Sequence, residues 1–269
     1  EAIRHDLGLD QPVIVRYVKY MGGMLHGDMG VSYVSKTDVF DTYMEKLPAT
    51  IKLSFASILV SILLSVPLGI YSATRQGTVQ DNISMIVAMI GLSMPNFWLG
   101  LLLIIVFSLN LGWFPSGGDQ TLSSIVLPAI TIGTGLMATL TRTTRSSMLD
   151  VLKQEYLRTA RAKGIPEKIV ITSHALRNAL IPIITIIGTQ LAGVLGGSVL
   201  TETVFAWPGV GRLIVDSLNM RDTPLVTGSI IMTTILLSII LLLVDLLYAV
   251  VDPRIKAQYV AKRGKKKHG

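Results

Sequence analysis

The side chains that perform acid–base, nucleophilic or metal chemistry are scattered in this sequence. Its 269 residues include no cysteine, and the four histidines, His5, His26, His174 and His268, lie far apart in the chain. We find no paired acids, no nucleophile–histidine arrangement and no metal-ligand spacing. The phosphate-binding sequence G-x-x-x-x-G-K-[ST] is also missing, because the single Gly-Lys pair, Gly264-Lys265, is followed by lysine. An enzyme is therefore the weakest interpretation, and we expect no metal or cofactor on this chain.

Long apolar runs indicate instead that the chain crosses a membrane. Half of the residues are hydrophobic and 15% are charged, whereas a soluble domain has about 25% charged residues. Runs of about 18 or more apolar residues are typical of membrane-spanning helices. The sequence predicts five such spans, which cover residues 51–74, 83–109, 123–141, 178–200 and 227–251. Pro95, Pro128 and Pro182 interrupt three of them, as buried helices tolerate.

The distribution of positive charge predicts the orientation of these spans. Sixteen of the 24 lysines and arginines lie in residues 75–82, 142–177 and 252–269. Cytoplasmic loops carry such an excess, so we expect these segments to be cytoplasmic and residues 1–50 and 201–226 to be external. The tail 252–269 is either a solvated topology anchor, which we favour, or a contact with anionic lipid.

Several polar residues lie inside the predicted spans and are candidates for lining a path through them. These are Asn96, Thr185, Gln190 and Asp245. An acid at membrane depth is a functional hypothesis by default, but hydrogen bonding or ion pairing between helices explains all four residues as well. In the predicted external loop, Glu202 and Trp207 either contact an external protein or belong to a re-entrant cap.

The stretch EYLRTARAKG, residues 155–164, predicts a short helix in water. Glu155 near its start and Lys163 at its end suit the helix dipole, and Gly164 followed by Pro166 suits its termination. Leu157, Ala160 and Gly164 share one narrow face of mostly small side chains. We interpret that face as a docking surface for a cytoplasmic protein, because membrane-surface helices carry bulkier apolar residues.

The same stretch, together with HALRNALIP (174–182), resembles the cytoplasmic coupling segment of ABC-importer permeases. The resemblance is strongest to the B-type permease of the dipeptide, oligopeptide and nickel subgroup, and it covers the whole chain. Further matching stretches follow in order: GDMGVSY (27–33), LPATI (47–51), GLSMPNFWLG (91–100), LGWFPSGG (111–118), ETVFAWPGVGRL (202–213) and LLVDLLYAVVDPRI (242–255). One departure is that only Ala160 and Gly164 match the Glu-Ala-Ala…Gly motif of the wider permease family.

The resemblance implies an all-α membrane protein, a polytopic transmembrane helix bundle of the type I ABC importer kind. It implies a permease domain over 51–251, with a coupling segment at 142–177, an external loop at 201–226, and one earlier family span missing from this chain. The residues assigned to ATPase coupling are Glu155, Tyr156, Leu157, Arg158, Thr159, Ala160, Arg161, Ala162, Lys163 and Gly164.

The expected partners are a second related permease, two cytoplasmic ATPases that carry ATP and Mg, an external binding protein and the bilayer of a bacterial or archaeal inner membrane. Peptides are the expected substrate, with nickel or another small solute as the alternative within the family. A secondary transporter is a weaker alternative, because Asp245 is the single acid within the predicted spans and no inverted repeat is recognisable.

Overall fold

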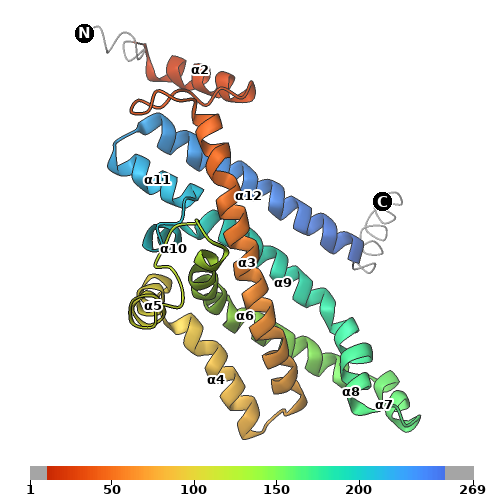
Figure 1. The fold of residues 1–269 in the computed structure, drawn as a ribbon. Coiled ribbons are helices and arrows are strands. Elements are labelled where there is room, and N and C mark those ends of the chain that lie inside the picture. The colour runs from red at the N-terminus through yellow and green to blue at the C-terminus, as the bar shows by residue number, and fades with distance from the viewer. Residues whose placement is uncertain (1–10, 252–269) are drawn as a thin grey trace, which may run out of the picture.

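Long apolar helices make up most of the computed structural model, which describes residues 11–251 (Figure 1). They are α3 (Val39–Thr74), α6 (Val126–Leu152), α9 (Leu176–Gly197) and α12 (Thr223–Val251). Within the described residues, four stretches are long and apolar enough to cross a membrane: Val39–Thr74, Leu122–Leu152, Glu167–Gly196 and Thr223–Leu247. The shorter helix η2 (Leu122–Ile125) leads directly into α6. These helices correspond to four of the five predicted spans.

The remaining predicted span is sharply bent. Helix α4 (Val79–Ser93) and the pair α5 (Asn96–Leu103) and η1 (Ile104–Asn110) meet at an angle of 96°. Pro95 stands at the break, and Met94 before it is extended, with φ −93° and ψ 132°. Proline excludes helical backbone from the residue that precedes it, so the break falls where the sequence places proline. Counting this pair as one broken span gives the predicted five.

The first span begins earlier than predicted, at Val39 instead of residue 51. Asp38 caps the helix, because its carboxylate accepts hydrogen bonds from the N–H groups of Phe40 (2.7 Å) and Asp41 (3.2 Å). The predicted external region therefore contributes twelve residues to α3 and contains a further helix, α2 (Val13–Leu25).

Helices α3 and α6 pack closely because small residues face each other along their contact. Five α3 serines are fully buried, namely Ser54, Ser57, Ser61, Ser65 and Ser72. A Cβ atom added to Gly133 of α6 would lie 2.9 Å from the carbonyl oxygen of Ser57, and one added to Gly69 of α3 would lie 2.8 Å from that of Thr141. Such backbone approach is how membrane helices associate without a hydrophobic driving force.

Two glycines of α9 allow close packing against α12, whereas a third, Gly193, faces open space. A Cβ atom on Gly188 would lie 2.7 Å from a methyl group of Val244, and one on Gly196 would lie 3.3 Å from Leu237, so both glycines pack against α12. These two glycines therefore form a packing surface for α12. Gly193 differs, because no heavy atom lies within 4 Å of its added Cβ. Most of the remaining surface of α12 is exposed and apolar.

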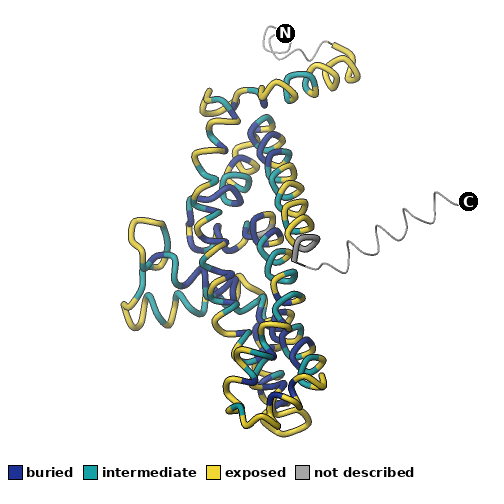
Figure 2. The backbone as a smooth tube through the Cα atoms, turned by 90° about the vertical axis from the view of Figure 1, so that its right-hand side faces the viewer, coloured by how far each residue is buried: buried dark blue, intermediate teal, exposed yellow. Residues whose placement is uncertain are grey.

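The two ends of the bundle carry different elements (Figure 1). At the lower end lie α7 (Glu155–Ala162), α8 (Glu167–Ile169) and the turn between α3 and α4, and at the upper end lies α2. Figure 2 shows α2 in the colours of exposed and intermediate residues, and none of its residues is buried. The predicted basic tail, 252–269, lies outside the described residues.

A buried carboxylate fastens the segment before α3 to the start of α12. Asp222 accepts hydrogen bonds from the hydroxyl of Ser32 and from the N–H groups of Tyr33 (3.1 Å) and Val34 (3.3 Å). Burial raises the pKa of the Asp222 carboxyl, but the hydrogen bonds from Ser32, Tyr33, Val34 and Leu225 outweigh it, so the net shift is downward. The carboxylate is therefore ionised at neutral pH and holds the two segments together.

Candidate functional site

The predicted short helix forms at the lower end of the bundle as α7, two residues after α6 ends. It stops where the sequence indicates, because Gly164 adopts φ +78°, a left-handed conformation that favours glycine. The N–H of Gly164 donates to the carbonyl of Arg161 at 2.9 Å, and that of Ile165 donates to the carbonyl of Ala160 at 3.3 Å. These bonds close the helix and turn the chain toward α8.

Two of the three residues of the predicted docking face of α7 face the interior of this chain. Leu157 is fully buried, and Ala160 is 8% exposed. Both belong to a hydrophobic cluster with Met148 of α6, Val170 of η3 (Val170–Ala175) and two residues of α9, Ala179 and Ile183. The prediction that Leu157 and Ala160 meet a partner is therefore wrong, whereas Gly164, the third residue of that face, is exposed. Its apolar side chains pack where the chain already offers an apolar core, and the exposed positions are Glu155, Tyr156, Arg158, Thr159, Arg161, Ala162, Lys163 and Gly164.

Polar contacts fix α7 against the segments that follow it. Arg161 donates two hydrogen bonds to Glu167 of α8, from Nε at 3.0 Å and from Nη2 at 2.8 Å. The hydrogen bond to Glu167 raises the pKa of the Arg161 guanidinium, which stays charged. The hydroxyl of Tyr156 accepts a hydrogen bond from Nδ2 of Asn178 at 2.8 Å. Side chains on the exposed side of α7 thus tie it to α8 and α9.

A cavity of about 440 Å³ lies between α4, α5, α6, α9 and α10 (Val199–Val204). Its lining is Leu92, Asn96, Ile132, Gly135, Leu136, Gln190, Gly193, Val194, Ser198 and Thr201, all of which are uncharged. Nε2 of Gln190 donates to the carbonyl of Leu136 at 3.1 Å, while its Oε1 is buried and has no hydrogen-bond partner among the described residues. The lining of the cavity therefore includes amide and hydroxyl side chains.

Two of the four predicted path residues, Asn96 and Gln190, line this cavity, and the other two do not. The hydroxyl of Thr185 donates to the carbonyl of Ile181, one turn earlier in α9. Asp245 lies on the exposed surface of α12. Thr185 and Asp245 therefore do not line this cavity, contrary to the hypothesis that they belong to the path.

Glu202 is the centre of a buried polar network. It is fully buried in α10. The hydroxyls of Thr50 and Ser198 donate to its Oε1 at 2.9 and 2.8 Å, and the N–H of Arg212 donates to its Oε2 at 3.1 Å. The network joins α3, the end of α9 and α11 (Val210–Asn219). A Cβ atom on Gly209 would lie 2.5 Å from the Glu202 carboxylate, so the chain approaches it closely.

Trp207 lies beside this network and is 3% exposed. Its Nε1 donates to the carbonyl of Ala49 at 2.9 Å, and its ring packs in a cluster with Leu53 and Ile132. The expectation that Glu202 and Trp207 contact an external protein is wrong, because both side chains bind within the chain. The loop that carries them folds against α3 and the end of α9. Sequence reasoning did not identify Thr50 and Ser198, the hydroxyls that satisfy the Glu202 carboxylate.

Family comparison covers nearly the whole chain. Residues 65–257 match the model of the binding-protein-dependent transport system inner membrane component, and residues 1–54 match the N-terminal model of the same kind of component. The oligopeptide transport system permease protein AppB of Bacillus subtilis is 46% identical over 93% of this chain and 82% of its own length. The glutathione transport system permease protein GsiC of Escherichia coli K12 is 41% identical over 95% of this chain and 84% of its own.

Solved structures show the same fold at lower sequence identity. An inward-facing structure of the MetNI methionine ABC transporter has a chain that superposes with a TM-score of 0.65 at 19% identity, covering 78% of this chain and 96% of that one. A chain of an amino acid ABC transporter superposes with a TM-score of 0.57 at 13% identity. The helix bundle, its spans and the family match agree: the chain is a multi-pass membrane protein that belongs to the inner membrane components of binding-protein-dependent transport systems.

Proposed function

We propose that this chain is one of two permease subunits of an ATP-driven importer and forms half of the path for peptides. The observation that carries the proposal is the cavity, which is walled by uncharged amide, hydroxyl and apolar groups and contains Asn96 and Gln190. Such groups suit the amide groups of a peptide. Relatives that are 46% and 41% identical are permeases for oligopeptides and glutathione.

The cavity also favours peptides over nickel. Transition metals such as nickel bind imidazole, carboxylate or thiolate ligands, and none of these lines the cavity. Among residues 11–251, no three histidine or acid side chains are placed to hold a metal ion.

The energy comes from other subunits in this proposal. The exposed surface of α7 faces the cytoplasm and binds one of two ATPases, and the other ATPase docks on the second permease. ATP and Mg are bound by the ATPases, because this sequence lacks the phosphate-binding loop. An external binding protein delivers the peptide, and the basic tail stays on the cytoplasmic side.

The packing of α7 explains how ATPase movement reaches the spans. Leu157 and Ala160 of α7 share a buried cluster with Leu140 and Met148 of α6 and with Ile183 of α9. Closure of the ATPases on ATP displaces α7, and the clustered helices move with it. The membrane part then shifts between inward-open and outward-open states, a population shift driven by differential binding.

Affinity capture of the full-length, tagged chain from its native membrane, followed by mass spectrometry, tests this assembly. We expect two ATPases, a related permease and a binding protein, whose bound ligand identifies the substrate. Recovery of the chain alone from membranes in which it is active would contradict the proposal and favour a secondary transporter.

Asn96→Leu tests the role of the cavity. The side chain is exposed into the cavity and makes no hydrogen bond with the described residues, so its loss leaves the fold intact. We expect peptide transport to fall about fivefold, the factor that corresponds to one lost hydrogen bond of about 1 kcal/mol. Thr185→Val is the matched control, because Thr185 bonds within its own helix. If Asn96→Leu transported peptide as well as Thr185→Val and the unaltered chain, Asn96 would not belong to the path.

A further inference from the structure

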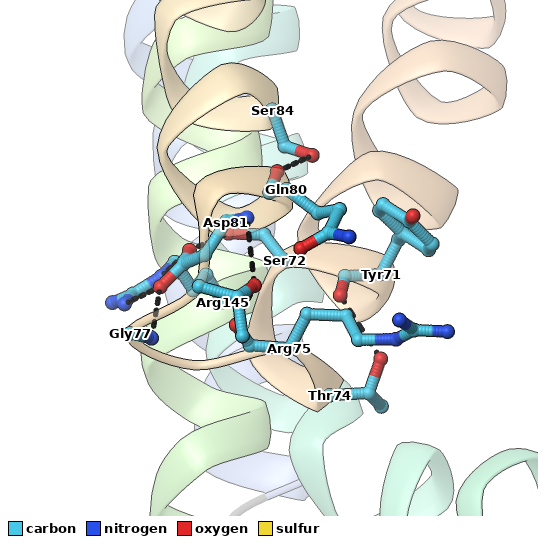
Figure 3. Close-up of polar contacts among 10 residues, drawn as sticks. Tyr71, Ser72, Thr74, Arg75, Gly77, Gln80, Asp81, Ser84 and Arg145 are labelled. Atoms are coloured by element: carbon cyan, nitrogen blue, oxygen red, sulfur yellow. Dashed lines mark hydrogen bonds and ion pairs between the residues drawn. The ribbon is translucent and has the colours of Figure 1, made fainter.

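An ion pair between a buried carboxylate and a partly buried arginine joins α4 to α6 at the same end of the bundle as α7 (Figure 3). Asp81, in the first turn of α4, is 2% exposed. Its carboxylate accepts two hydrogen bonds from Arg145 of α6, from Nε at 2.8 Å and from Nη2 at 2.7 Å. The hydroxyl of Ser72 in α3 and the N–H of Gly77 in the intervening turn also donate to it. One carboxylate thus connects three elements.

The other end of α4 is held against α6 as well. A Cβ atom on Gly91 would lie 2.4 Å from the carbonyl oxygen of Thr134, so the two backbones touch there. Directly beyond this contact, Leu92 and Asn96 line the cavity opposite Ile132 and Gly135 of α6. Helix α4 is therefore fixed to α6 at both ends and carries part of the cavity wall.

Arg145 also stands close to the point where α6 meets α7. Met148, three residues later and so on the adjoining turn of α6, is fully buried in the cluster that contains Leu157 and Ala160 of α7. Helix α6 therefore links two contacts, that of Met148 with α7 and that of Arg145 with Asp81, and α4 continues from Asp81 to the cavity.

We propose that the Asp81–Arg145 pair is a clamp that makes α4 and α6 move as one body, so that a displacement of α7 reaches the cavity wall. This inference rests on the proposed function. The two-bond geometry matters, because a guanidinium fork fixes the orientation of the carboxylate that it binds, whereas an ammonium group acts as a point charge. Both residues are positioning residues that need not touch the peptide.

Arg145→Lys separates this role from simple stabilisation, because it keeps the charge and loses the fork. In proteoliposomes that contain the complete importer, we expect the peptide transported per ATP hydrolysed to fall about fivefold, as for one lost hydrogen bond. The matched control is Arg142→Lys, an exposed arginine one turn earlier on α6, which should leave this ratio unchanged. An unchanged ratio in Arg145→Lys would contradict the clamp.

A second measurement remains valid if Arg145→Lys lowers the amount of assembled importer. The chain contains no native cysteine, so spin labels can be attached through Asn82→Cys on α4 and Ser146→Cys on α6, both exposed positions. With Arg145 intact, the distance between the labels should be the same without nucleotide and with trapped ATP. A distance that changes between these states would contradict movement as one body.

The same proteoliposomes distinguish failure of the clamp from failure of the proposed function. Without ATP-driven uptake by the unaltered importer, the proposed function fails and the clamp with it. With normal ATP-driven uptake, an unaltered ratio in Arg145→Lys or a changing label distance rejects the clamp alone.

Discussion

Glu202→Ala is expected to lower the free energy of unfolding by several kcal/mol, because each buried donor left without an acceptor costs about 1–3 kcal/mol. The substitution removes the acceptor of the Thr50 and Ser198 hydroxyls and of the Arg212 N–H. All three donors would remain buried or half-buried without that acceptor, and water does not reach a fully buried site readily. Thermal unfolding of the purified chain in detergent measures the effect.

Two further variants define the cause. Thr203→Ala, on the exposed side of the same helix, should unfold like the unaltered chain. Glu202→Gln should cost less than Glu202→Ala, because its remaining oxygen still accepts from Thr50 and Ser198. If Glu202→Ala unfolded normally but no longer bound an external protein, the buried network would be the wrong explanation and the sequence-based prediction of a contact would return.

Ala160→Glu is expected to unfold the segment around α7 at a cost of about 3–5 kcal/mol, because it places an uncompensated charge in a hydrophobic cluster. Ala160 packs in that cluster with Leu157, Met148 and Val170. Limited proteolysis of the chain in membranes should therefore cleave between α6 and α9 faster in the variant than in the unaltered chain.

Ala162→Glu is the matched control, since Ala162 lies on the exposed side of α7. It should resist proteolysis like the unaltered chain while weakening co-purification of the ATPase, because it adds a charge to the exposed surface that we assign to docking. Normal proteolysis of Ala160→Glu together with lost ATPase binding would show that the small face docks after all.

The sequence was sufficient where the cause of a structure is local. Proline at position 95 produces the break in the second span, and Gly164 ends α7 in the left-handed conformation that its position predicts. Asn96 and Gln190 were identified as polar residues within spans, and both line the cavity. The hydrophobic runs predicted the helix bundle because the bilayer sets their length and polarity.

It was insufficient where the meaning of a residue depends on a distant segment. Helical periodicity shows that Leu157 and Ala160 share a face, but not whether a partner or the same chain covers it. Glu202 accepts a hydrogen bond from Thr50, which is 152 positions away in the sequence, and Asp81 accepts from Arg145, which is 64 positions away. From the sequence, Arg145 is only one of many charges that predict orientation, although in the structure it binds a buried acid.

Uptake of a labelled peptide by proteoliposomes tests the central claim most directly. The vesicles should contain this chain with its second permease and the two ATPases, and should receive the binding protein on the side of residues 201–226. We predict accumulation against a peptide gradient that requires both hydrolysable ATP and the binding protein. Accumulation driven by a proton or sodium gradient without ATP would contradict the account and show that the chain works as a secondary transporter.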